Sequence, residues 1–211
     1  MYHKFLLFLI TCFIATNLFS QSELSVALIL DEATLKASSF LNLIPEGREA
    51  DYGFNSRSDF SRIKIEKPYK TYFVSVINDQ LAFIFSDWRV PLSVDGDYKT
   101  LLTVQLSNGK AEVVDLGGNN LVHKIQEAES IFARDNMQRV LIRNTFLNRD
   151  YLAPGFNTLT DGTDKLSLKD INITILPSLY QLNKDEPISI HVKDFYQDTI
   201  DFINNRKQTD K

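Results

Sequence analysis

The sequence predicts an α+β domain in which an antiparallel meander carries helices packed on one of its faces. Between residues 69 and 117, runs rich in β-branched and aromatic residues alternate with short turn segments, which is typical of an antiparallel sheet. Segments with helical periodicity precede and follow this region instead of alternating with its strands. That order favours the α+β class over a parallel α/β fold.

The first 21 residues have the layout of a cleaved secretory signal. Lys4 precedes an apolar run from Phe5 to Ala15, which is shorter than the roughly 20 residues that span a bilayer. Cys12 ends a segment that loosely resembles a lipobox, so a lipid anchor is an alternative, but Thr11 at the cleavage position argues against it. We therefore expect export to the periplasm or the exterior, with no membrane span left after residues 1–21 are removed.

Composition limits the chemistry of the remaining chain. Cys12 is the only cysteine and lies in the signal, so disulfides, iron–sulfur clusters and thiolate zinc sites are excluded from the single domain expected over residues 22–206. The chain has 27 acidic and 23 basic residues, and loss of Lys4 changes the net charge from −4 to −5. No cluster of basic residues interrupts this balance, so we expect no nucleic-acid partner. Residues 207–211 are a polar tail.

Two helices are predicted before the sheet. Residues 31–43 have helical periodicity, and Asp31 stands where it could cap their N-terminus. The turn 45–47, Pro-Glu-Gly, ends this helix. Ser56 and Asp59 have the spacing of a capping box, which predicts a second, short helix beginning there.

The meander is predicted to contain four or five strands. Apolar and polar side chains alternate along residues 87–94, where Pro91 favours an edge position or a bulge. The dipeptides at 95–96, Asp-Gly, and 108–109, Asn-Gly, predict tight hairpin turns, because these residues adopt the positive φ that type I′ turns require. The predicted strands are 69–77, 81–86, 87–94, 98–106 and 110–116.

Further elements are predicted after the meander. Residues 117–120 turn the chain into a helix over 119–135, whose apolar residues recur at helical spacing. Residues 149–170 lose periodicity and gather Pro, Gly, Asp and Thr, so we expect a long loop. A cystatin-like or NTF2-like architecture, a curved sheet wrapped on a helix, is compatible with this order but carries no function. The other predicted elements are strands at 138–146, 171–176 and 187–195 and a C-terminal helix at 195–206.

No motif in the sequence points to catalysis, a metal or a nucleotide. His123 and His191 are predicted to face solvent, because each stands opposite the apolar residues of its own element. The turn 117–120 lacks the glycine spacing of phosphate loops, and the acidic stretch 161–164 lacks the register of an EF-hand. We therefore predict no catalytic residue, no metal and no cofactor.

Aromatic side chains are the candidates for binding. Tyr52 and Phe54 follow the first predicted helix, and Tyr151 and Phe156 stand in the predicted long loop. Exposed ring faces can bind sugars or peptides. Trp88, the only tryptophan, shares a strand face with aliphatic residues, so we assign it to the core.

Two hypotheses of function follow. The leading one is a non-catalytic exported module that binds a protein or peptide partner in the cell envelope through the segments 45–60 and 149–170. It depends on the export signal, the well-patterned core and the lack of convergent acid–base motifs. The alternative is a small-molecule binder or hydrolase with a pocket between the sheet and helix 119–135, which requires His123 or His191 to face inward.

Overall fold

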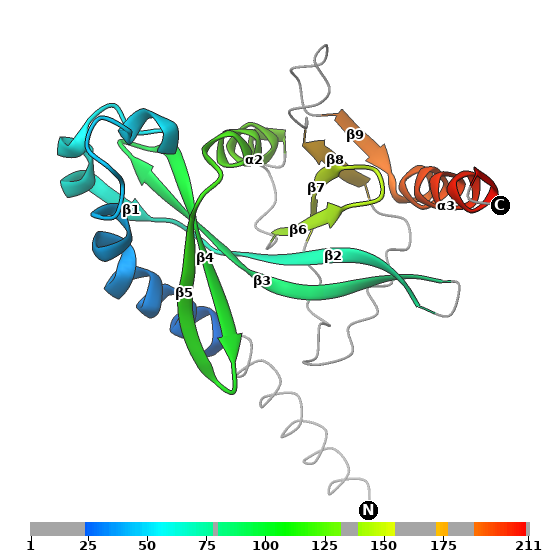
Figure 1. The fold of residues 1–211 in the computed structure, drawn as a ribbon, viewed down its shortest axis with the longest axis horizontal. Helices are drawn as coiled ribbons and strands as arrows, with labels where there is room; N and C mark the ends of the chain where they lie inside the picture. The colour runs from blue at the N-terminus through cyan, green and yellow to red at the C-terminus, as the bar shows by residue number, and fades with distance from the viewer. Residues whose placement is uncertain (1–23, 78–79, 132–138, 155–171, 177–187, 210–211) are drawn as a thin grey trace, which may run out of the picture.

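The predicted α+β class is confirmed by a computed structural model in which helices pack on a mostly antiparallel sheet (Figure 1). The sheet has nine strands in the order β5-β4-β3-β2-β6-β7-β8-β9, and β1 pairs with β3 beside this series. Among the described strand pairs, only β2 and β6 run parallel. The structure describes residues 24–77, 80–131, 139–154, 172–176 and 188–209.

Most elements lie close to where the sequence predicted them. The strands are β1 (Ile63–Ile65), β2 (Tyr69–Ile77), β3 (Gln80–Val94), β4 (Asp97–Ser107), β5 (Lys110–Gly117), β6 (Arg139–Asn144), β7 (Arg149–Pro154), β8 (Asn172–Leu176) and β9 (Ile188–His191). The helices are α1 (24–41), the 3-10 helices η1 (Glu49–Tyr52) and η2 (Arg57–Arg62), α2 (Asn119–Ile131) and α3 (Val192–Thr209).

The meander has four strands, β2 to β5, because the two predicted runs 81–86 and 87–94 form one long strand, β3. The predicted hairpin turn between β4 and β5 is confirmed by positive φ angles of 53° at Asn108 and 73° at Gly109. Pro91 lies inside β3, one residue before a register shift between Leu92 and Ser93. The extra residue at this shift is Lys99 of β4, whereas Pro91 pairs with Leu101, so the irregularity is not a bulge at the proline.

Helix α1 begins earlier than predicted. The structure describes it from residue 24, so Asp31 lies within the helix on its exposed side and is not an N-cap. Ile29 and Ala33, four residues apart, are both buried in the core on the opposite side. The apolar stripe thus continues across Asp31, because an exposed carboxylate on the outer face does not interrupt the packing of the inner face.

The predicted capping box of the second helix is half formed. Ser56 precedes η2 but makes no capping hydrogen bond with its side chain. Asp59 supplies the other half, because its buried carboxylate accepts the Asn55 backbone N–H at 2.8 Å. The Arg62 guanidinium donates to the same carboxylate at 2.5 Å.

Helices α1 and α2 pack on opposite faces of the sheet. The neighbouring β4 residues Leu101 and Leu102 point to opposite faces, and both are fully buried. Leu102 belongs to the cluster that α1 covers, whereas Leu101 packs with Val122 and Ile125 of α2. Figure 1 shows α1 and α2 on either side of β4 and β5. The helices therefore occupy two faces and not the single face expected, because β4 carries apolar side chains on both.

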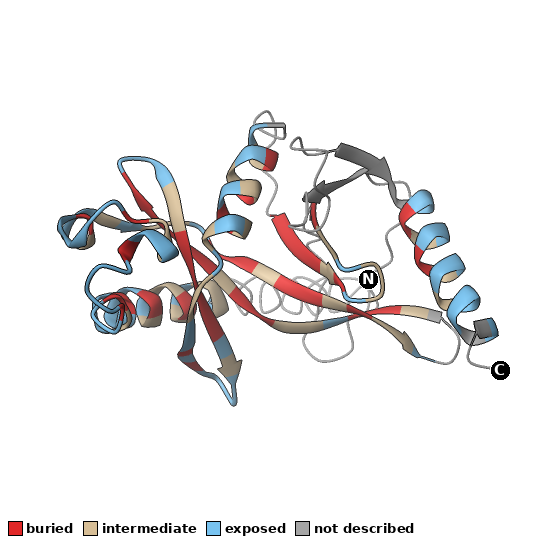
Figure 2. Cartoon of the chain, turned by 45° about the horizontal axis from the view of Figure 1, so that its top comes forward, coloured by how far each residue is buried: buried red, intermediate tan, exposed pale blue. Residues whose placement is uncertain are grey.

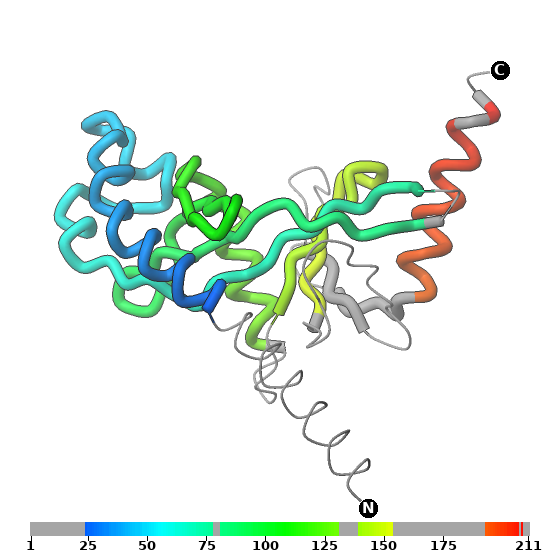
Figure 3. Tube along the Cα trace, turned by 90° about the horizontal axis from the view of Figure 1, so that it is seen from below, coloured from blue at the N-terminus to red at the C-terminus, as the bar shows by residue number. Residues whose placement is uncertain are grey.

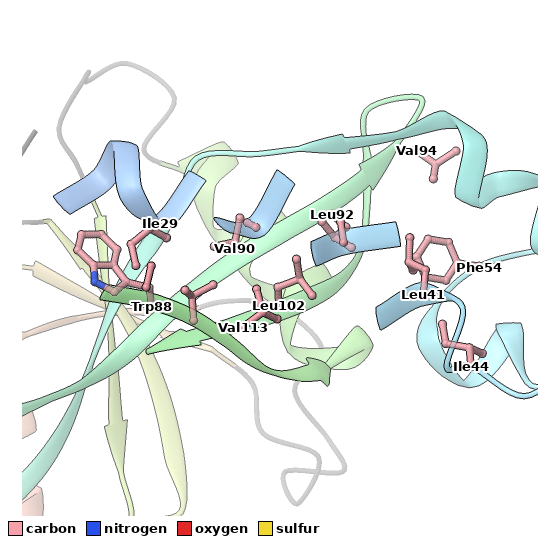
Figure 4. Packing of buried hydrophobic residues seen from close by; sticks show 14 residues of the cluster. Ile29, Leu41, Ile44, Phe54, Trp88, Val90, Leu92, Val94, Leu102 and Val113 are labelled. Carbon is pink, nitrogen blue, oxygen red and sulfur yellow. The ribbon is translucent and has the colours of Figure 1, made fainter. Parts of the chain in front are cut away.

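The largest cluster fills the space between α1 and strands β3 to β5. Figure 4 shows Ile29 beside Trp88 at one end and Leu41 beside Phe54 at the other. Trp88 is buried, so its assignment to the core is confirmed. Its ring also contacts Phe85 edge-on, with centroids 6.3 Å apart. This cluster joins the helix, the 3-10 segments and the meander into one body.

Beyond this body, β2 and β3 continue as an antiparallel pair, residues 69–77 and 80–87, which we call the arm (Figures 1 and 3). On its other side, β2 also pairs with β6 from Lys70 to Phe73. Figure 3 shows α3 lying across the arm. Phe195 of α3 packs on Phe83 and on Tyr151 of β7, with ring centroids 6.0 and 4.8 Å apart. Figure 2 shows that buried residues continue from the body into the arm.

Candidate functional site

Tyr52 and Phe54, two of the predicted binding residues, lie against the core. Phe54 is only 1% exposed and packs edge-on against Phe60. Tyr52 is half-buried in η1 and contacts the same cluster. The structure therefore corrects the expectation for Phe54, because a buried ring offers no face to a partner.

Of the second predicted pair, Tyr151 lies in the core and Phe156 lies outside the described residues. Tyr151 is buried in β7, so residues 149–154 form a strand where a loop was predicted. Residues 149–154 form a strand by pairing with β6 and β8, which their own sequence does not indicate. Phe156 and the rest of the predicted loop lie outside the described residues.

The structure agrees with the prediction for His123, which is exposed on α2. His191 ends β9, and its side chain is not among those described. The turn before α2 is a strand-to-helix turn, as predicted: Gly118 has φ of 81°, and its carbonyl accepts the Val122 N–H at 2.9 Å. The Asn119 side-chain oxygen accepts the N–H of the next residue, Asn120, at 2.8 Å, which is not the second or third helical amide that a cap binds. The acidic stretch 161–164 lies outside the described residues.

A partly buried polar cluster joins α2 to the sheet. The Tyr69 hydroxyl of β2 hydrogen-bonds Glu129 of α2 and Tyr98 of β4. Gln126 of α2 accepts the Tyr98 N–H at 3.0 Å and donates to the Gly96 carbonyl at 2.8 Å. These contacts tie one helix to two strands, which sequence periodicity could not reveal because the residues are far apart in the chain.

Burial decides the chemistry of this cluster. It raises the pKa of Tyr69 and of Tyr98 above the usual value, and the nearby Glu129 carboxylate raises both further. Both hydroxyls therefore stay protonated near neutral pH and act as hydrogen-bond donors, not as bases. Val122 and Ile125 are fully buried against the sheet beside them. Where the alternative hypothesis places a pocket, the described side chains pack directly on one another.

A second polar group lies at the base of the arm. The buried Asp87 carboxylate accepts from the Arg89 guanidinium at 2.8 Å and from the Ser86 hydroxyl at 2.6 Å. Asp87 pairs across the ladder with Thr71, and Arg89 with Thr103. The hydroxyls of Thr71 and Thr103 are buried without a hydrogen-bond partner among the described residues. The ion pair compensates the charge of Asp87 within the chain, so it is not a free acid or base.

Several arginines on the described surface are paired with carboxylates of the same chain. The pairs are Arg48 with Asp51, Arg57 with Glu49, Arg62 with Asp59 and Asp95, and Arg143 with Asp150.

The feature of the fold best suited to binding is an unpaired strand edge. Within the described residues, β3 pairs with β2 alone from Gln80 to Asp87, and its pairing with β4 begins only at Trp88. In an antiparallel pair, the N–H and C=O groups of every second residue point away from the partner strand. The arm therefore presents a row of backbone donors and acceptors along β3, which we call the β3 edge, residues 80–87.

From Leu81 to Phe85, the side chains of the β3 edge are apolar on both faces. Residues 81–86, Leu-Ala-Phe-Ile-Phe-Ser, contain no charge and no proline. Ile84 is 47% exposed, and Ile77, opposite the start of β3 on the neighbouring strand, is 48% exposed. The sequence did carry this signal as an uncharged run. It could not show that one side of the run has no neighbouring strand among the described residues.

Comparison of the chain with protein-family models, curated proteins and solved structures finds no match. Among the described residues, no helix is both long enough and apolar enough to cross a membrane. In the same part of the chain, no group of three or more His, Cys, Asp and Glu side chains could hold a metal ion.

Proposed function

We propose that this protein is an exported, non-catalytic binding module that pairs its β3 edge with an extended strand of another polypeptide. The observation that carries the proposal is the one-sided pairing of β3 from Gln80 to Asp87. Strand addition of this kind takes its affinity from backbone hydrogen bonds and its specificity from alternate side chains. Export rests on the signal-like residues 1–21.

The chemistry of the edge supports a protein ligand. Its free groups are backbone amides and carbonyls, and these match another backbone in extended form. The exposed side chain of Ile84 favours a guest strand with apolar residues on that face. Long, apolar and uncharged edges also aggregate unless something covers them, so a strand partner would remove this liability.

The polar groups support a non-catalytic role. Tyr69 and Tyr98 are held protonated, with Tyr69 bonded to Glu129 and to Tyr98, and Asp87 is paired with Arg89. These groups stabilise the contact of α2 with the sheet and the base of the arm.

Photo-cross-linking tests the proposal. A photoreactive amino acid replaces Ile84 in the full chain, and the control carries it at Val114 of β5, which is 43% exposed on another strand. Irradiation in the producing cells should give a discrete cross-linked polypeptide from position 84 and none from position 114. Backbone amides of residues 81–86 should also exchange more slowly in the complex than in the free protein.

In a chain without the photoreactive residue, Ile84→Lys should abolish the slower amide exchange at residues 81–86, because a lysine on an edge strand disfavours pairing. Val114→Lys should leave the slower exchange unchanged. Equal cross-linking from the two positions, or exchange at residues 81–86 that the partner does not slow, would contradict the proposal.

A further inference from the structure

We propose that the strand paired with the β3 edge is β3 of a second copy of this chain, antiparallel to the first, with Phe83 on the two-fold axis. This inference rests on the proposed function and names its partner. A two-fold interface is isologous, so the same residues must be complementary to themselves. The β3 edge meets this requirement because its residues are uncharged from Gln80 to Ser86.

Symmetry restricts the register to few choices. Directly opposite residues in an antiparallel pair point to the same face, whereas successive residues of a strand point to opposite faces. The two-fold axis must therefore lie where a residue is opposite its own copy, and not between two successive residues. With Phe83 on the axis, Leu81 lies opposite Phe85 and Ala82 lies opposite Ile84. Seven residues of each strand then pair, 80–86, and no charged side chain enters the pairing.

The neighbouring register is less favourable. With Ile84 on the axis, the apolar Leu81 would lie opposite Asp87 in both halves of the interface. The Asp87 carboxylate already accepts from Ser86 and Arg89, and pairing there would cover this ion pair further with apolar side chains. The Phe83 register stops one residue short of Asp87. It also places Ala82 of the partner strand beside Ile84, the exposed apolar side chain of the edge.

The other described outer edge of the meander, that of β5, is less suited to the same contact. Lys110, Glu112 and Asp115 give it charges along its whole length. A register shift against β4 also interrupts it near Val113. Charges and bulges on an edge are features that prevent strand addition. The two meander edges therefore differ, and the β3 edge is the one that is self-complementary.

Cysteine cross-linking tests the register. Cys12 is the only native cysteine, so full chains carrying Cys12→Ser contain only the introduced thiol. One chain also carries Ala82→Cys and the other Ile84→Cys, with different tags, and the two are co-expressed. Opposite residues of an antiparallel pair lie about 4.5–5.5 Å apart at Cα, within disulfide range, whereas diagonal ones lie about 7–8 Å apart. We expect a disulfide between the two different chains and little within either kind alone.

The mass of the full chain in solution gives a second measurement. The wild-type protein and Val114→Lys should be dimers, and Ile84→Lys should be a monomer with an unchanged circular dichroism spectrum. A monomeric wild-type chain, or disulfides of Ile84→Cys with itself alone, would overturn the proposed pairing.

The proposed dimer can be disproved while the proposed function still holds. A monomer that still cross-links a different polypeptide from position 84 would overturn the dimer and support strand addition. A dimer that forms no cross-link from position 84 and no mixed disulfide would overturn both.

Discussion

Replacing Phe195 by alanine tests whether α3 holds the arm in place. Phe195 is fully buried, and its ring contacts three others. The centroid distances are 4.8 Å to Tyr151, 5.8 Å to Tyr196 and 6.0 Å to Phe83. Tyr151 belongs to β7 and Phe83 to the arm, so the Phe195 ring connects α3 with both of these elements.

The expected loss follows from burial and ring contacts. Truncation of a buried phenylalanine to alanine costs about 3–5 kcal/mol, of which each edge-on or stacked ring pair supplies about 0.5–1.5 kcal/mol. We therefore expect Phe195→Ala to lower the free energy of unfolding by at least about 3 kcal/mol. Phe202 of the same helix is 37% exposed, so Phe202→Ala should cost less than about 1 kcal/mol.

Urea unfolding measures the difference with two signals. Circular dichroism follows the whole fold, and fluorescence follows Trp88, the only tryptophan, in the cluster under α1. If the arm and α3 unfold as a unit of their own, Phe195→Ala will shift the circular dichroism transition more than the fluorescence transition. Equal free energies for Phe195→Ala and Phe202→Ala, within about 1 kcal/mol, would refute the role assigned to Phe195.

Three further predictions concern the body of the fold. Gly53→Ala should destabilise the protein far more than Gly109→Ala in the same urea assay, because both have positive φ but a Cβ at Gly53 would lie 2.3 Å from the Lys99 carbonyl oxygen. The raised pKa of Tyr69 contributes stability that is complete below about pH 10 and is lost at higher pH, at about 1.4 kcal/mol per pH unit. Tyr69→Phe should therefore flatten the fall in the free energy of unfolding between about pH 9 and 11. An equally steep fall in the variant would contradict this. Asp59→Asn should flatten the acid limb, because the Asn55 amide lowers the pKa of Asp59, and the resulting stability is complete above about pH 4 and lost as the pH falls further. An unchanged acid midpoint in that variant would contradict the assignment.

Local patterns predicted the meander well because they act over a few residues. The Asn108-Gly109 turn and the long β-forming run of β2 determine their own conformations. The order of the strands in the sheet could not be predicted from such local patterns. The parallel pairing of β6 with β2 places Thr71 opposite Leu141, and nothing in either segment specifies the other. Alternation indicates which residues share a face and does not indicate the neighbouring strand.

The second helix-covered face had a signal that could have been read. Residues 101–104 of β4, Leu-Leu-Thr-Val, are all buried, and such a run is typical of a strand covered on both sides. Alternation in 87–94 suggested a half-buried sheet instead. Tyr151 was misplaced for a related reason: an aromatic ring in a presumed loop cannot be told from a core ring until the neighbouring strand is known.

The change in the surroundings of β3 explains how one strand belongs to the core and also offers an edge. From Trp88 to Val94 it has β4 on one side, and α1 covers one face. From Gln80 to Asp87 it has β2 alone. The change coincides with Ser86, which the ladder leaves unpaired between Phe85 and Asp87. A bulge bends its strand and increases the local twist, so it would turn the arm away from β4 and leave the outer side of β3 without a neighbour. The bulge at Ser86 is therefore the feature that produces the unpaired β3 edge.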